Sequence, residues 1–111
     1  MPKFIYLYKG PATEAAEMGP ELAQEVMAKW GEWMQKTGSA LVDMGAPMNK
    51  RGASVVDDGS AGQAAELNGY SIVEAADLEA AKALCDGHPF LSDKTGDFSI
   101  EVYELLPVPG M

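Results

Sequence analysis

The chain has little of the chemistry that usually marks a metal, disulfide or nucleophilic site. Its 111 residues include one cysteine and one histidine. A single cysteine cannot form an internal disulfide, which agrees with a reducing compartment, so we expect a cytoplasmic protein. Zinc usually takes several Cys or His ligands, and the spacing of Cys85 and His88 supplies only half of such a set. We therefore expect no metal and no cofactor.

Basic residues and long apolar runs are also scarce. Lysine and arginine number 8 against 17 aspartates and glutamates, which gives a formal net charge of −9. Nucleic acids and anionic membranes need a basic protein face that releases counterions, so neither is expected as a partner. No apolar run reaches transmembrane length, and residues 4–8 are too short for the apolar core of a signal peptide.

The chain does contain clear strand and helix signals. Residues 3–8 are rich in β-branched and aromatic residues and stop at Gly10, which predicts a first strand. Pro20 suits the first turn of a helix, while Lys36 and Gly38 suit its end. Between these signals the apolar residues recur at helical spacing: Leu22, Val26, Met27, Trp30, Trp33 and Met34. This pattern predicts an amphipathic helix.

The rest of the chain continues the order of strands and helices. Strands are predicted at residues 40–44, 70–74 and 98–105, with a short edge strand at 54–56 and a loop at 57–62. Asp77 suits the N-cap of a second helix, and Gly87 suits its stop. The apolar stripe of that helix consists of Leu78, Ala81, Leu84 and Cys85.

This order of elements predicts one α+β domain over residues 1–111. The succession β-α-β-β-α-β is the ferredoxin-like plan, a four-stranded antiparallel sheet with two helices on one face. Both sides of the first strand are apolar, with Phe4, Tyr6 and Tyr8 on one side and Ile5 and Leu7 on the other. Because the helices cover only one face, we expect a homodimer that covers the open sheet face.

Five segments, taken in order, resemble the motifs of the YCII-related proteins, including the branch called DGPF-domain proteins. They are Leu41-Val42-Asp43-Met44-Gly45, Gly69-Tyr70-Ser71-Ile72-Val73-Glu74-Ala75, Asp77-Leu78-Glu79-Ala80-Ala81, His88-Pro89-Phe90-Leu91 and Ser99-Ile100-Glu101-Val102. The resemblance implies a dimeric α/β barrel of ferredoxin-like protomers with a cleft between sheet and helices. One characterised relative is a dehydrochlorinase that acts on a chlorinated hydroxyquinone.

The chain also departs from that family pattern. Relatives with a proposed active site carry a histidine on the first helix that works with an aspartate, whereas residues 26–29 contain no histidine. The loop that names the DGPF branch lacks its proline and phenylalanine at residues 58–61. Catalytic roles therefore do not transfer through the resemblance.

Two residues are the candidates for chemistry. His88 is the only side chain whose ordinary pKa lies near neutrality, and Asp43 interrupts an apolar strand. If any pair carries chemistry, we expect neutral His88 to abstract a proton while the Asp43 carboxylate orients the ring. The alternatives are a histidine that caps a turn and an aspartate at a strand end in contact with solvent.

A ligand cleft is expected from the aromatic residues Tyr6, Tyr8, Trp30 and Phe90 beside this pair. The alternative for Trp30 is plain core, which the helical spacing also fits. Two functions remain open. One is an enzyme that catalyses proton transfer or elimination on a small cyclic or aromatic compound. The other is a non-catalytic dimeric module that binds a regulatory ligand or a partner protein.

Overall fold

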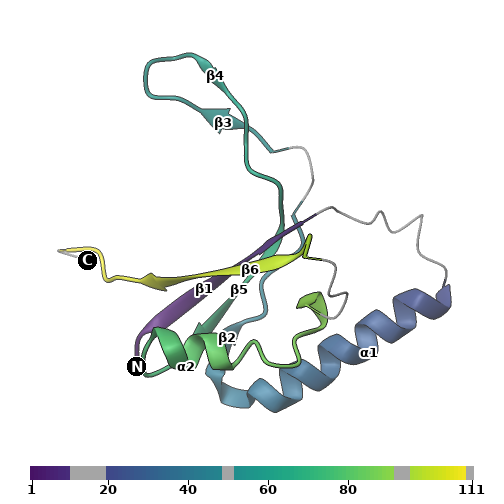
Figure 1. Ribbon diagram of the computed structural model, residues 1–111. Helices are drawn as coiled ribbons and strands as arrows, with labels where there is room; N and C mark the ends of the chain where they lie inside the picture. The colour runs from purple at the N-terminus through teal and green to yellow at the C-terminus, as the bar shows by residue number, and fades with distance from the viewer. Residues whose placement is uncertain (11–19, 49–51, 92–95, 110–111) are drawn as a thin grey trace.

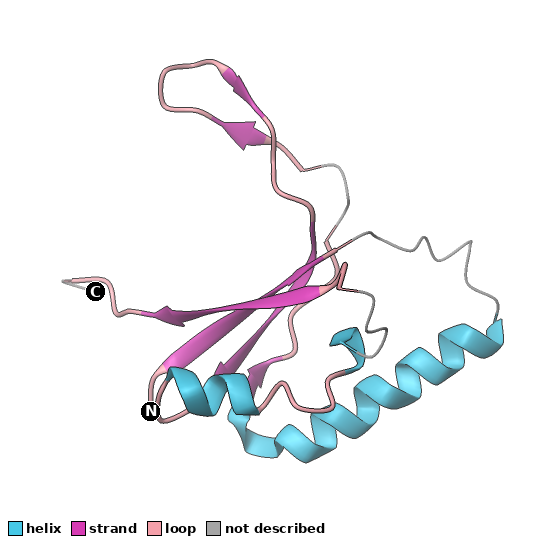
Figure 2. Cartoon of the chain, in the orientation of Figure 1, coloured by secondary structure: helices cyan, strands magenta, loops and turns pink. Residues whose placement is uncertain are grey.

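The computed structural model describes residues 1–10, 20–48, 52–91 and 96–109, except for the side chains of Leu22 and Ala23. Its main sheet has the order β2-β5-β1-β6, formed by β1 (Lys3–Lys9), β2 (Leu41–Asp43), β5 (Leu67–Glu74) and β6 (Ser99–Leu105). All neighbouring strands are antiparallel. Helices α1 (Pro20–Thr37) and α2 (Leu78–Ala83) lie on the same side of this sheet (Figure 1 and Figure 2). The predicted α+β, ferredoxin-like plan is confirmed.

The helix ends follow the local sequence signals. Helix α1 begins at Pro20 with Glu21 in its first turn and has Lys36 in its last turn. The Asp77 side chain accepts a hydrogen bond from the Ala80 N–H at 2.8 Å, which caps α2. Gly87 follows with a positive φ of 75°, the backbone conformation that favours glycine at a helix end.

Helix α2 is shorter than predicted. Beyond Ala83 the backbone bonds tighten to a three-residue spacing, with Cys85 N–H donating to Lys82 O and Asp86 N–H donating to Ala83 O. This tightening ends the regular helix, and one more such bond joins His88 N–H to Cys85 O at 2.9 Å. The chain then forms the short helix η3 (Pro89–Leu91). These turns bring the histidine back over the sheet.

A second, two-stranded sheet formed by β3 (Ser54–Val55) and β4 (Ala61–Gly62) projects from the body of the molecule (Figure 1). The predicted edge strand therefore exists, but it pairs with residues that were predicted to be loop and not with the main sheet. The turn is held by the Asp58 carboxylate, which accepts from both the backbone N–H and the hydroxyl of Ser60. Such an Asx turn favours a local hairpin.

The core lies between the main sheet and the two helices. Alternate residues of β1 point into it, and Phe4 and Tyr6 are fully buried, while Ile5 and Leu7 on the opposite face are half-buried. Helix α2 contributes only Ala81 to the fully buried set; Leu78, predicted in its stripe, is 46% exposed. No helix in the described part of the chain is long and apolar enough to cross a membrane.

Candidate functional site: an apolar cavity beside a buried histidine

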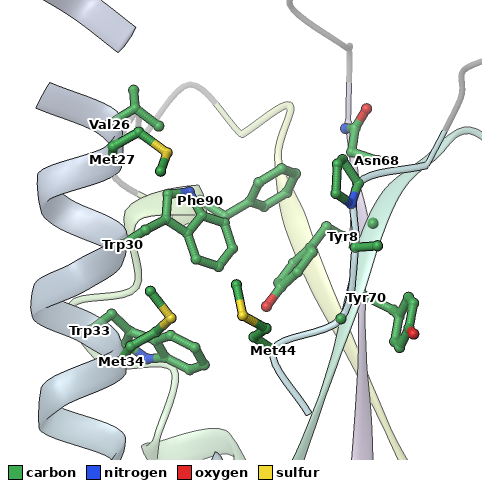
Figure 3. A pocket seen from close by; sticks show the side chains of 14 residues that line it. Tyr8, Val26, Met27, Trp30, Trp33, Met34, Met44, Asn68, Tyr70 and Phe90 are labelled. Carbon is green, nitrogen blue, oxygen red and sulfur yellow. The ribbon is translucent and has the colours of Figure 1, made fainter. Parts of the chain in front are cut away.

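A cavity of about 380 Å³ lies between helix α1 and the sheet (Figure 3). Its lining comes from α1, from the central strands, from the segment after β2 and from η3. The lining residues are Tyr8, Val26, Met27, Trp30, Trp33, Met34, Met44, Gly45, Ala46, Pro47, Asn68, Gly69, Tyr70 and Phe90. Most of these side chains are aromatic, aliphatic or thioether groups, so the cavity is suited to an apolar ligand.

Four aromatic rings form a continuous wall of the cavity. The Trp30 ring meets Tyr8 edge-on at 5.6 Å between centroids and Trp33 at 6.1 Å. Phe90 from η3 lies 5.1 Å from Tyr8. Trp33 is also fixed by a hydrogen bond from its Nε1 to the Leu84 carbonyl at 2.8 Å. Because these rings brace one another, their faces are held in place before any ligand arrives.

His88 lies directly behind this wall. It is 2% exposed, and its ring centroid is 4.3 Å from Trp33 and 4.7 Å from Trp30. Burial among these rings lowers the pKa of His88 to about 4, because the charged imidazolium would lose its hydration. The ring is therefore neutral near pH 7.

A chain of hydrogen bonds links His88 to the sheet. The Phe90 backbone N–H donates to His88 Nδ1 at 3.1 Å, so the proton of the neutral ring is on Nε2. His88 Nε2 lies 3.1 Å from the Tyr8 hydroxyl, to which it donates. Tyr8 donates to Ser71 Oγ at 2.7 Å, and Ser71 donates to the Met44 carbonyl at 2.9 Å. Each of these polar groups has a partner.

The structure does not join the two residues expected to carry chemistry. Both ring nitrogens of His88 are engaged by Phe90 and Tyr8, and Asp43 is exposed, where its carboxylate accepts from the Gly45 N–H at 2.8 Å. Among the described residues no hydrogen bond or ion pair connects His88 to Asp43. The alternative for His88 was a histidine that caps a turn, and its Nδ1 does accept the Phe90 N–H in the turn before η3, although the ring is buried. A catalytic role of this pair stays a prediction.

Of the four aromatic residues expected in the cleft, Tyr8, Trp30 and Phe90 line the cavity. Tyr6 is placed differently. It is fully buried, and its hydroxyl donates to the Ala81 carbonyl of α2, outside the lining set. The strand alternation that groups Tyr6 with Tyr8 does not say how far along the strand the cavity begins.

Sequence reasoning missed two parts of the site. Ser71 is fully buried on the same face of β5 as Val73, so a lone hydroxyl among apolar alternate positions was the available signal. The segment 44–47 forms one wall of the cavity, and Gly45 in it has a positive φ of 75° against the Tyr70 backbone. A glycine in that conformation indicates a close backbone approach, but it does not identify the partner.

The site offers little to a metal ion. Within the part of the chain that the structure describes, no three or more His, Cys, Asp and Glu side chains are grouped to hold one. Cys85 is half-buried, its Sγ lies 4.0 Å from the Ala81 carbonyl, and burial raises the pKa of its thiol. A thiol with a raised pKa is a poor nucleophile and a poor metal ligand.

The fold and this cavity define a class: a ferredoxin-like α+β domain with an apolar, aromatic-walled cavity between its first helix and its sheet. The YCII-related domain matches residues 1–108, and the chain belongs to that family. Comparison with curated protein sequences gave no match. Among solved structures, the chain is similar to 5-chloro-2-hydroxyhydroquinone dehydrochlorinase from Burkholderia phenoliruptrix in complex with 2,5-dihydroxybenzoquinone. The identity is 14%, the TM-score 0.57, and the match covers 94% of this chain and 93% of that one, so it shows the shared fold.

Proposed function

We propose that this protein binds a small, planar, cyclic or aromatic compound in the cavity between α1 and the sheet. The observation that carries the proposal is the preformed wall of Tyr8, Trp30, Trp33 and Phe90 around an open volume of about 380 Å³. Flat rings stack on aromatic faces, and their transfer from water into an apolar cavity is favourable. The flexible methionine side chains can adapt to the shape of the bound ring.

The size of the cavity sets the size of the ligand. Small-molecule sites usually enclose roughly 300–1,000 Å³, and a dry cavity of about 150 Å³ already accepts benzene. The volume here, about 380 Å³, leaves room for one substituted ring or a fused pair. The similar dehydrochlorinase structure holds a benzoquinone, a ring of this size, which supports the proposal.

The geometry favours binding over proton abstraction by His88. A general base needs a free lone pair within reach of the substrate, whereas Nδ1 accepts from Phe90 and Nε2 carries the proton. Proton transfer or elimination on the bound compound would therefore need a base other than this imidazole, or a rearranged hydrogen-bond chain. A non-catalytic ligand-binding module is the function that fits the observed contacts.

The proposal includes a homodimer that covers the open sheet face. That face carries Ile5 of β1 opposite Ile72 of β5 and Tyr103 of β6, with Leu7 opposite Tyr70 in the next row. Tyr103 and Leu105 are 54% and 40% exposed. These side chains form an apolar patch bordered by Glu74 of β5 and by the Lys9–Glu101 ion pair, and an exposed apolar patch on a sheet is usually covered by a partner. A cytoplasmic location also stays a prediction, which the single cysteine supports.

The binding proposal can be tested with the two tryptophans, because both line the cavity and the chain has no others. The protein labelled with ¹⁵N is titrated with indole and with benzofuran, two flat bicyclic compounds that suit the volume. We expect both compounds to shift the two indole N–H signals saturably, and calorimetry to give one site per chain.

A matched pair of variants separates the cavity from the rest of the surface. Trp30→Ala should weaken binding by tenfold or more, because this ring forms the α1 side of the wall. Val55→Ala is the control, since Val55 is 96% exposed on the projecting hairpin. The proposal fails if neither compound binds at millimolar concentration, or if Trp30→Ala binds them as wild type does.

A further inference from the structure

We propose that the cavity selects ring compounds that carry a neutral hydrogen-bond donor, an O–H or N–H group, which the Tyr8 hydroxyl oxygen accepts. This inference rests on the proposed binding function and adds the chemical class of the ligand. Tyr8 lines the cavity, and its hydroxyl is directed towards the space beside Met44 (Figure 3). Tyr8 is the binding residue, whereas His88 and Ser71 are positioning residues that act through it.

The direction of the hydrogen-bond chain is fixed at both ends by the backbone. At one end the Phe90 N–H can only donate, so His88 must accept at Nδ1 and donate from Nε2. At the other end the Met44 carbonyl can only accept, so the Ser71 hydroxyl must donate to it. Between these ends the Tyr8 hydroxyl accepts from His88 and donates to Ser71.

This fixed direction determines what Tyr8 can offer a ligand. A phenol hydroxyl has one hydrogen and two lone pairs. The hydrogen is held by Ser71 at 2.7 Å, and one lone pair faces His88 at 3.1 Å. One lone pair remains, so Tyr8 can accept a hydrogen bond from a ligand. It cannot donate to one without giving up Ser71, which would leave a fully buried hydroxyl short of a partner.

Tyr8 and His88, the two titratable groups in this chain of hydrogen bonds, keep the same charge over the physiological pH range. Burial raises the pKa of Tyr8 to about 12, against the opposing effect of its hydrogen bond with Ser71. Burial lowers the pKa of His88 to about 4. With both groups neutral, the described residues that line the cavity offer no cation to a carboxylate or phenolate ligand, and the neutral donor is the form that Tyr8 can receive.

The test uses three bicyclic probes of nearly the same shape. Indole carries an N–H donor, benzofuran has an ether oxygen in its place, and 1-indanone carries a carbonyl acceptor. Calorimetry with the wild-type protein should give indole the tightest binding of the three, by about three- to tenfold, which corresponds to one neutral hydrogen bond. Indole is less hydrophobic than benzofuran, so simple partitioning would not place indole above benzofuran.

Two variants change the donor and acceptor capacity of the site in opposite ways. Tyr8→Phe removes the acceptor and should lower the indole-to-benzofuran affinity ratio by about three- to tenfold. Ser71→Ala releases the Tyr8 hydrogen, so 1-indanone should gain affinity while benzofuran changes little. Tyr6→Phe is the matched control, because Tyr6 is on the same strand face but its hydroxyl bonds to Ala81 outside the cavity. It should leave all three affinities in the same order.

Distinct results overturn the inference and the binding proposal. If the wild-type protein binds benzofuran or 1-indanone as tightly as indole, donor selection is wrong while the cavity still binds rings. The same conclusion holds if Tyr8→Phe and Ser71→Ala, checked for native circular dichroism, leave the ratios unchanged. If no probe binds at all, the proposed function itself fails.

Discussion

Trp30 and Trp33 are three residues apart on α1, yet their surroundings differ. Trp33 is 2% exposed, packs on His88 and Tyr6, and donates to the Leu84 carbonyl, whereas Trp30 is half-buried against the cavity. Trp33→Ala should therefore cost about 3–5 kcal/mol of unfolding free energy, the range for a core tryptophan. Trp30→Ala should cost roughly half as much, since its cavity side has few contacts to lose.

Urea denaturation followed by far-ultraviolet circular dichroism measures both changes without relying on tryptophan fluorescence. The more conservative Trp30→Phe should recover most of the stability and part of the ligand affinity. Equal losses for the two alanine variants would mean that Trp30 is ordinary core and that the cavity closes over it.

His88 should make the stability of the protein depend on pH. Its pKa falls from the ordinary 6.5 to about 4 in the folded state, so the unfolded chain binds more protons between these values. The contribution of neutral His88 to stability is complete at pH values above the pKa of the unfolded chain and is lost as the pH falls towards 4. From pH 7.5 to pH 5 the expected loss is about 2 kcal/mol.

A change in stability over this pH range can be assigned to His88 because the chain has one histidine. Urea midpoints at several pH values between 5 and 7.5 measure the slope. His88→Phe removes the titrating group and should flatten that slope even though its overall stability is lower. A slope that survives in His88→Phe would assign the pH dependence to other groups.

At the scale of elements, the contact between the segment after β2 and strand β5 forms one wall of the cavity. A Cβ at Gly45 would lie 1.7 Å from the Tyr70 backbone oxygen, and its φ is +75°. Gly45→Ala should cost about 2–4 kcal/mol, because the backbone must move as well as adopt an unfavourable conformation. Ligand affinity should fall with it, since residues 44–47 line the cavity.

Gly59→Ala is the matched control for this effect. Gly59 has a similar φ of +84°, but no heavy atom lies within 4 Å of the added Cβ. Its cost should be about 1 kcal/mol, from backbone conformation alone, with unchanged ligand affinity. Chemical denaturation and calorimetry of the two variants check the difference, and equal costs would rule out the close approach at Gly45.

For the whole molecule, a lysine introduced on one face of the sheet should have a different effect from a lysine introduced on the other face. Ile5 is on the open face, whereas Ile100 packs against the core on the helix side. In the proposed dimer, which should bury roughly 2,000 Å² or more, Ile5→Lys should yield folded monomers. Ile100→Lys should unfold the protein instead, because it buries an unpaired charge.

Sedimentation velocity with circular dichroism distinguishes a folded monomer from an unfolded chain. The wild-type protein should sediment as a dimer at micromolar concentration. A folded wild-type monomer under these conditions would contradict the dimer, and an Ile5→Lys variant that remains dimeric would assign the interface to another surface.

Local physical chemistry determined much of the fold from the sequence alone. Proline, glycine and capping residues act on backbone groups a few positions away, so the start of α1 at Pro20 and the cap at Asp77 were predictable. The alternation along β1 likewise assigned Phe4, Tyr6 and Tyr8 to one face of the sheet. From these signals followed the order of the main-sheet strands and the two helices.

Only the tertiary structure decided which groups meet in the site. Tyr8 is 80 residues from His88 and 63 from Ser71 along the chain, and no spacing rule connects them. From the sequence, Asp43 was the expected partner of His88. A sequence shows which side chains carry charge, but not where they point or how far apart they lie. Strand register, the tight turns after α2 and the bend at Gly45 placed a tyrosine there instead and left the cavity open beside it. These are properties of packing between distant segments, which a local pattern does not contain.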